Sequence, residues 1–204
     1  MTKTEVLICI IVGLIVGFVF GWIDVTYASS WDMQYKMIER AKFYNDLHVQ
    51  YSYKLDHPQD VATDEQIYNR VNSLWYWTQE YHDNQYDMKE IVLTLYSIIE
   101  LESGWVNYKH QDGKTGFGLG ALQNTTAKII ADMLDEQYNH NLLVADTHKQ
   151  IQYIVYYFYY LLNREKDINK AIVSYNKGSV YGNKRIEQYY FKVKGRKEHF
   201  KEIF

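Results

Sequence analysis

The sequence Ile-Ile-Glu-Leu-Glu-Ser-Gly-Trp at residues 98–105, followed by a polar loop and by Gly-Leu-Gly-Ala-Leu-Gln at residues 118–123, decides the interpretation of this chain. The residues that lead into it are apolar at the spacing of one helix face: Met88, Ile91, Leu95 and Ile98. Glu102 extends this stripe by four residues, whereas Glu100 points about 160° away from it at 100° per residue. The pattern predicts an amphipathic helix with Glu102 at the end of its apolar face.

Glu102 is our candidate catalytic residue, although most glutamates at helix ends are ordinary surface charges. A carboxylate near a helix C-terminus opposes the helix dipole, so electrostatics gives no structural reason for its position. Apolar surroundings raise the pKa of a carboxyl group and prepare it to donate a proton near neutral pH. We therefore expect Glu102 to act as a general acid.

The composition excludes several classes of function. A net charge of −3 gives no reason to expect nucleic acid binding, and the seven histidines show neither metal-ligand spacing nor an HExxH motif. We therefore expect no metal and no other cofactor. The only cysteine, Cys9, lies in an apolar N-terminal run, so the rest of the chain has no disulfide and no cysteine nucleophile.

The apolar run Val6–Ile23 contains 18 uninterrupted residues, which is long enough to span a bilayer. A cleavable signal peptide is the alternative, with a small-residue cleavage site between Ala28 and Ser29. We favour a retained anchor, because the run is longer than the apolar part of most signal peptides. The run also carries a stripe of small residues that would allow self-association, at Gly13, Gly17 and Gly21.

Three segments follow from these patterns: an anchor or signal sequence at 1–28, a helical spacer or bracing region at 29–85, and a catalytic domain at 86–204. In the second segment, one helix face is formed by Met33, Met37, Ala41 and Tyr44. A capping box of Thr63 and Gln66 then begins a further helix, whose inward residues are Ile67, Val71 and Leu74. Trp75 and Trp77 are expected to pack this helix on the catalytic domain.

The catalytic segment is expected to be mainly α-helical, because no period-2 strand pattern of any length appears in it. Asn124 or Thr125 is expected to cap one helix, and Thr147 to begin another. The second of these carries a clean apolar stripe: Ile151, Ile154, Val155, Phe158, Leu161 and Leu162. A short helix is expected from Asp167 to Gly178, followed by a charged tail at residues 184–201 that we interpret as a solvated helix face.

Three short motifs occur in order along this segment. They are Glu102-Ser103-Gly104-Trp105, then Gly120-Ala121-Leu122-Gln123, then Ser174-Tyr175-Asn176-Lys177-Gly178. Together they resemble the soluble lytic transglycosylases, relatives of goose-type lysozyme, over roughly residues 86–190. The chain departs from the family pattern at Ala121, Leu122, Asn124 and Ser174, none of which removes a polar catalytic group.

The resemblance implies a lysozyme-like domain that cleaves the β-1,4 bond between N-acetylmuramic acid and N-acetylglucosamine in peptidoglycan. In this family a single glutamate, here Glu102, acts first as acid and then as base. The substrate's own N-acetyl group is the nucleophile, and a 1,6-anhydro ring forms. The resemblance also implies that Ser103 holds the helix end and that Gln123 and the backbone beside it hydrogen-bond the N-acetyl sugar. It implies that Tyr175 places its hydroxyl near Glu102 or the reacting N-acetyl group, and that Asn176 braces its loop. Trp105 is expected to be a core residue.

Two alternatives remain open from the sequence. The first is a lysozyme-type hydrolase, with Asp112 as the second carboxylate. The second is a non-catalytic protein that binds the wall as part of an envelope or virion. For either enzyme we expect a single-pass anchor with the catalytic domain on the cell-wall side, in a bacterial envelope or in a phage virion or host envelope.

Overall fold

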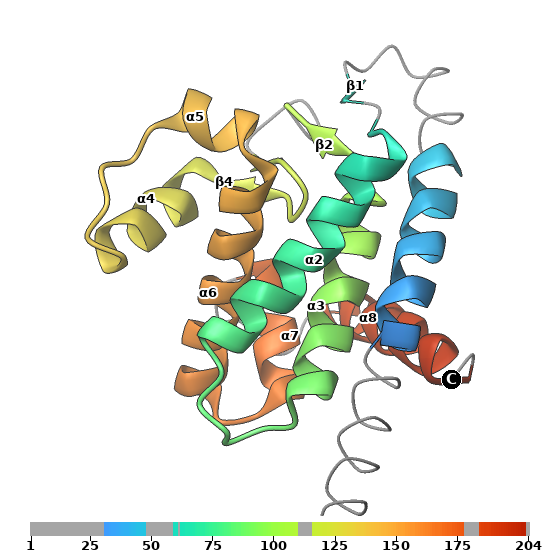
Figure 1. Cartoon of the computed structure of the whole chain (residues 1–204). Coiled ribbons are helices and arrows are strands. Elements are labelled where there is room, and N and C mark those ends of the chain that lie inside the picture. The colour runs from blue at the N-terminus through green and yellow to red at the C-terminus, as the bar shows by residue number, and fades with distance from the viewer. Residues whose placement is uncertain (1–30, 48–58, 61, 110–115, 178–183, 203–204) are drawn as a thin grey trace, which may run out of the picture. The chain divides into compact units, whose positions relative to one another are not determined.

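The computed structural model describes residues 31–47, 59–60, 62–109, 116–177 and 184–202. These residues are mainly helical, which confirms the predicted fold class (Figure 1). Residues 31–47 form one helix. The further helices are α2 (Asp64–Glu80), α3 (Met88–Ser103), α4 (Asn124–Met133), α5 (His140–Ala145), α6 (Thr147–Glu165), α7 (Ile168–Lys177) and α8 (Lys184–Glu202). The chain divides into two units, Met1–Met37 and Ile38–Phe204, and the second contains all the elements from α2 onward.

Helix α3 is the buried centre of the second unit and packs against α2, α6 and α8. Its N-terminus is capped by the Asp87 side chain, which accepts a hydrogen bond of 3.0 Å from the Lys89 amide. Every residue from Ile91 to Glu100 is buried. The predicted apolar stripe is therefore only part of the buried surface of this helix, and Glu100 on the other side is also inside the protein.

Helices α2 and α6 form the principal pair beside α3 (Figure 1). The predicted capping box of Thr63 and Gln66 is present at the start of α2, and its three predicted inward residues are buried. The six residues of the predicted α6 stripe are also buried. The Trp77 ring lies 5.1 Å from the His148 ring, which joins α2 to α6.

The described strands form two antiparallel pairs of two residues each. Strand β1 (Gln59–Asp60) pairs with β2 (Asn107–Tyr108), and β3 (Gly116–Phe117) pairs with β4 (Leu122–Gln123). Two residues cannot establish an alternating pattern in a sequence, so periodicity gave no signal for these strands. The Gly118–Gln123 motif follows β3, and its last two residues form β4.

The predicted cap of α4 was wrong. Gln123 is the N-cap residue, with extended backbone, and it makes no side-chain cap hydrogen bond. Asn124 is already the first helical residue, and its side chain accepts a hydrogen bond of 2.7 Å from the Tyr138 hydroxyl. The Asn124 side chain therefore binds Tyr138 and does not cap the helix.

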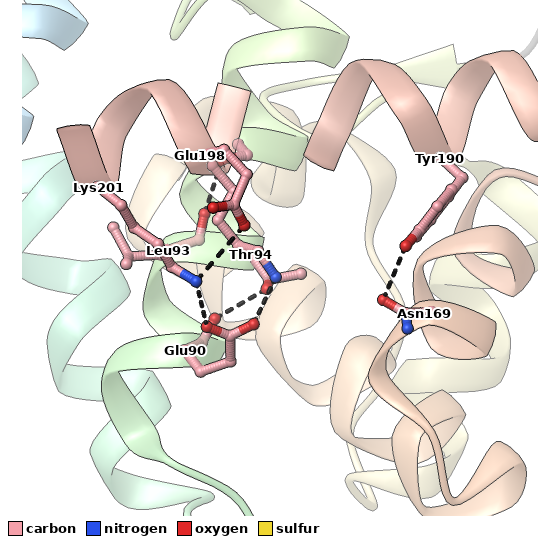
Figure 2. Close-up of polar contacts among 9 residues, drawn as sticks. Glu90, Leu93, Thr94, Asn169, Tyr190, Glu198 and Lys201 are labelled. Carbon is pink, nitrogen blue, oxygen red and sulfur yellow. Dashed lines mark hydrogen bonds and ion pairs between the residues drawn. The ribbon is translucent and has the colours of Figure 1, made fainter. Parts of the chain in front are cut away.

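The C-terminal helix α8 is not simply a solvated face, which corrects a further prediction. Lys197 is buried and donates a hydrogen bond to Glu90 of α3, and Lys201 lies 3.3 Å from the other oxygen of the same carboxylate. Figure 2 shows Lys201 between Glu90 and Glu198, and it shows Tyr190 of α8 donating to Asn169 of α7 over 3.2 Å. These contacts fix α8 against both α3 and α7.

Among the described residues, no helix is both long and apolar enough to cross a bilayer. The apolar run Val6–Ile23, with its three glycines, lies outside those residues, as does the cleavage site at Ala28. Asp112 and Gly178 also lie outside them.

Candidate active site

The C-terminal end of α3 presents Glu102 at the surface of the buried core. Ser103 is fully buried, and its hydroxyl donates to the Ile99 carbonyl over 3.1 Å and accepts from the Trp105 amide over 3.2 Å. Gly104 and Trp105 both have left-handed backbones, with φ of 58° and 69°, which turns the chain sharply away from the helix. Glu102 itself is half-buried. The turn holds its backbone while leaving its side chain within reach of solvent.

The Trp105 side chain is completely buried, as predicted for a core residue. Arg70 of α2 donates a hydrogen bond of 2.6 Å to the Trp105 carbonyl. The turn after Glu102 is therefore fixed from two sides, by Ser103 within α3 and by Arg70 from α2.

The segment between β3 and β4 contains two glycines, and at Gly120 it passes close to both α6 and α7. The Gly118 amide donates to the Tyr108 carbonyl over 2.7 Å. At Gly120, the Cβ atom of any other residue would lie 2.5 Å from the Tyr175 hydroxyl and 2.7 Å from Ile154. Glycine is required at this position because the backbone must approach the tyrosine closely.

Tyr175 of α7 connects this segment to Glu102. Its hydroxyl donates a hydrogen bond of 3.0 Å to the Gly120 carbonyl, and the residue is buried. Burial raises the pKa of Tyr175 well above its usual value, and the negative charge of Glu102 raises it further. The structure thus brings Glu102, Gly120 and Tyr175 together from three different elements.

A second tyrosine, Tyr189 of α8, was missed in the sequence. It is buried, and its pKa is raised well above the usual value by burial and then by the charge of Glu102. Apart from Glu102, its hydroxyl meets no hydrogen-bond partner among the described residues. The only available signal was the spacing of Tyr189 and Val193 along one buried face of α8.

Each tyrosine hydroxyl has one hydrogen to donate and keeps it at neutral pH. Tyr175 donates its hydrogen to the Gly120 carbonyl, so the Tyr189 hydroxyl is the donor that faces Glu102. Donors beside a carboxylate can orient it, or can bind a carbonyl oxygen that enters the same site. Glu102 with Tyr175 and Tyr189 therefore forms a group suited to proton transfer.

Two further residues of the predicted site, Gln123 and Asn176, are exposed. Gln123 ends β4 and precedes α4, and Asn176 follows Tyr175 in α7. Gly120 lies in the same short segment as Gln123. Its carbonyl accepts the hydrogen bond of Tyr175, which lies near Glu102. Its exposed amide is available to a ligand, in contrast to the buried Ser103, whose hydrogen bonds are both to backbone.

Glu100 lies two positions before Glu102 and has a different environment. Arg40 donates two hydrogen bonds to its carboxylate, of 2.6 and 2.8 Å, and Arg196 of α8 lies 3.2 Å from it. Its side chain is fully buried. Glu100 therefore joins Arg40 and α8 to α3, and it has no access to a substrate.

Within the part of the chain that the structure describes, no group of three or more histidine, cysteine, aspartate or glutamate side chains is placed to hold a metal ion. A family model described as the transglycosylase SLT domain matches residues 79–197, which is more than half of the chain. The chain belongs to this family. The predicted resemblance is confirmed. A comparison with curated proteins found no match.

The SLT match begins inside α2 and ends inside α8, so it contains all the residues of the candidate site. SLT domains are lysozyme-like and act on peptidoglycan as lytic transglycosylases, and the helical structure agrees with such a domain. The match also includes Tyr189, which lies after the third motif in the sequence.

Proposed function

We propose that this protein is a peptidoglycan lytic transglycosylase, which cleaves the bond between N-acetylmuramic acid and N-acetylglucosamine and leaves a 1,6-anhydro ring on the muramic acid. The observation that carries the proposal is the position of Glu102, half-buried at the end of α3 and interacting with the hydroxyls of Tyr175 and Tyr189 inside an SLT domain. A single carboxyl group placed in this way suits a mechanism in which one residue is both acid and base.

In the first step Glu102 is protonated and gives its proton to the glycosidic oxygen. The bond from that oxygen to the anomeric carbon breaks, and N-acetylglucosamine leaves with the proton as a hydroxyl group. The carbonyl oxygen of the muramic acid's N-acetyl group bonds to the anomeric carbon and completes a cyclic intermediate. Glu102 is then a carboxylate.

In the second step the Glu102 carboxylate takes the proton of the C6 hydroxyl of the same muramic acid. The C6 oxygen attacks the anomeric carbon, and the bond from the N-acetyl oxygen to that carbon breaks. The N-acetyl group is restored, the 1,6-anhydro ring is closed, and Glu102 is protonated for the next cycle. No second carboxylate is required, because the N-acetyl oxygen takes the place of a carboxylate nucleophile, and no water molecule is consumed.

The remaining residues have supporting roles in this proposal. The Tyr189 hydroxyl stays protonated and orients Glu102 or the reacting N-acetyl oxygen, whereas the Tyr175 hydroxyl lies near Glu102 and donates to the Gly120 carbonyl. The exposed Gln123 binds the N-acetyl sugar, Asn176 supports the end of α7, in which it lies, and Ser103 keeps the end of α3 in shape. Exclusion of water from the cyclic intermediate separates this reaction from hydrolysis.

The proposal is tested by incubating the purified protein with purified peptidoglycan and analysing the soluble fragments by mass spectrometry. A lytic transglycosylase releases fragments that end in 1,6-anhydromuramic acid. Fragments with reducing ends would instead assign the hydrolase, with Asp112 as its candidate second carboxylate. A protein that binds the wall without cleaving it would release no fragments.

We also propose that residues 6–23 anchor the protein in a membrane, with the catalytic domain on the cell-wall side. The support is the length of the apolar run, with Lys3 before it and Asp24 after it. The full chain should then remain with membranes after a carbonate wash. A mature N-terminus at Ser29 would show that the segment is a cleaved signal sequence instead.

A further inference from the structure

A buried glutamine of α6, Gln150, holds together several segments around the candidate active site. Only 1% of its surface is exposed. Its side-chain oxygen accepts a hydrogen bond of 3.0 Å from the Leu119 amide. Its side-chain nitrogen lies 3.0 Å from each of three oxygens: the Asn107 side-chain oxygen and the carbonyl oxygens of Leu143 and Val144.

The chemistry of these partners fixes the orientation of the amide. The Gln150 oxygen faces a donor, and its nitrogen faces only acceptors, so the reversed orientation would bring oxygen against oxygen on one side. The nitrogen has two hydrogens for three acceptors, so at least one hydrogen is shared. No other side chain of similar size supplies both an acceptor for Leu119 and donors for the opposite oxygens.

Leu119 lies in the segment that carries the second sequence motif into the active site. Gln150 holds this segment at the Leu119 amide, and Tyr175 holds the next residue at the Gly120 carbonyl. Gly118 lies directly against the Gln150 amide, where a Cβ atom would overlap its oxygen. The segment that leads to Gln123 is therefore held by hydrogen bonds to a side chain of α6 and a side chain of α7.

We propose that Gln150 is a positioning residue for glycan binding. It sets the place of the Gly118–Gln123 backbone, so that the Gln123 amide faces the sugar whose glycosidic bond Glu102 protonates. This inference rests on the proposed function of the same site. Gln150 does not touch the substrate, and its effect passes through the Leu119 amide. Its loss should therefore weaken substrate binding more than it slows the proton transfers of Glu102.

Gln152 provides a matched control on the same helix. It is also a buried glutamine of α6, but its side-chain nitrogen donates to the Tyr81 hydroxyl at the end of α2, over 2.8 Å. Replacing either glutamine by methionine keeps the side-chain length and removes its hydrogen bonds. Gln150→Met and Gln152→Met therefore both disturb a buried polar group of α6, and only the first affects the Gly118–Gln123 segment.

The experiment measures KM and kcat of the full chain on soluble glycan strands, together with the thermal unfolding midpoint. We expect Gln150→Met to raise KM at least about tenfold and to change kcat less than about threefold, because binding geometry is lost and the acid is retained. Gln152→Met should leave both constants within about twofold while also lowering the midpoint. Equal changes in KM for the two variants, or an unchanged KM for Gln150→Met, would overturn the inference.

Two further measurements keep the outcome decisive. If Gln150→Met does not fold, Gly118→Ala displaces the same segment from the loop side and should raise KM by a similar factor, and an unchanged KM would overturn the inference. Cosedimentation with intact peptidoglycan, in a Glu102→Gln background, measures binding without cleavage. Weaker binding for Gln150→Met in that assay would support the inference even if the parent protein released no fragments, and this outcome would refute the proposed reaction alone.

Discussion

The last turn of α3 has two sides, and they surround two glutamates with different chemistry. On one side, Glu100 is fully buried and receives two hydrogen bonds from Arg40, with Arg196 close by. On the other side, Glu102 is half-buried and interacts with the hydroxyls of Tyr175 and Tyr189. Guanidinium groups stabilise a carboxylate as an ion and suit a structural link, whereas phenol hydroxyls suit a carboxyl group that changes its protonation. Burial alone would have pointed to Glu100, whose contacts with Arg40 and Arg196 instead suit a structural link.

The largest expected effect is on the rate of Glu102→Gln. Removing a general acid costs roughly 10²–10⁴ in rate, and here the same group acts twice, so fragment release should fall at least that far. The half-buried position of Glu102 predicts little change in the thermal unfolding midpoint. Clearing of a peptidoglycan suspension is the measurement, and a variant that clears at nearly the parent rate would remove Glu102 from the mechanism.

The matching change on the other side, Glu100→Gln, should affect stability instead. It leaves Arg40 and Arg196 without their carboxylate, and breaking one partner of a buried ion pair costs about 3–5 kcal/mol. Urea unfolding at neutral pH measures this loss directly. The comparison between the two sides fails if Glu100→Gln unfolds like the parent protein.

A smaller effect is expected for Tyr189→Phe, which removes one hydroxyl beside Glu102 and keeps the ring. We expect the rate to fall about tenfold, because the acid remains and loses one orienting donor. Tyr159→Phe is the matched control, since Tyr159 is also buried but its hydroxyl donates to the Thr78 carbonyl over 3.4 Å. Equal rates for the two variants would mean that Tyr189 has no part in the chemistry.

The smallest expected effect concerns Glu90, at the other end of α3 (Figure 2). Burial acts to raise the pKa of Glu90, but hydrogen bonds from Lys197 and Lys201 outweigh it and lower the pKa. A carboxyl group whose pKa is lowered by folding stabilises the protein above its unfolded pKa of about 4.3, and this contribution is lost as the pH falls through the lowered value. Glu90→Gln should therefore cost about 1 kcal/mol or less at pH 7, and less than that near about pH 3, which lies below the unfolded pKa.

Urea unfolding of the parent and of Glu90→Gln at the two pH values measures this difference. A cost that is the same at both values would show that the contacts of Lys197 and Lys201 with this carboxylate do not depend on its charge.

Much of the fold was predictable because its signals are local. The capping box of Thr63 and Gln66, the stripe of α6 and the apolar approach to Glu102 each lie within one helix, where spacing along the chain determines which residues share a face. The family was also predictable, since its three motifs occur as short, contiguous sequences, and the SLT match confirmed it.

The features that were missed depend on contacts between distant residues. Glu100 and Arg40 are separated by 60 positions, and no local pattern connects them. Tyr189 comes from a helix that was interpreted as a solvated face, because its lysines conceal the buried positions between them. The predicted cap of α4 was wrong, since the Asn124 side chain accepts a hydrogen bond from Tyr138 and Gln123 is the N-cap residue. Sequence spacing shows which residues share a face of one helix. The candidate site is formed by residues of three helices, α3, α7 and α8.

In the proposed reaction Glu102 transfers both protons and no water molecule takes part. This proposal is tested most directly by digesting purified peptidoglycan with the full chain in water labelled with oxygen-18 and determining the masses of the muramic acid ends. We expect 1,6-anhydro ends that carry no label, and none of these products from Glu102→Gln. Reducing ends that carry the label would contradict it, because they would show that water, and not the C6 hydroxyl, attacks the anomeric carbon.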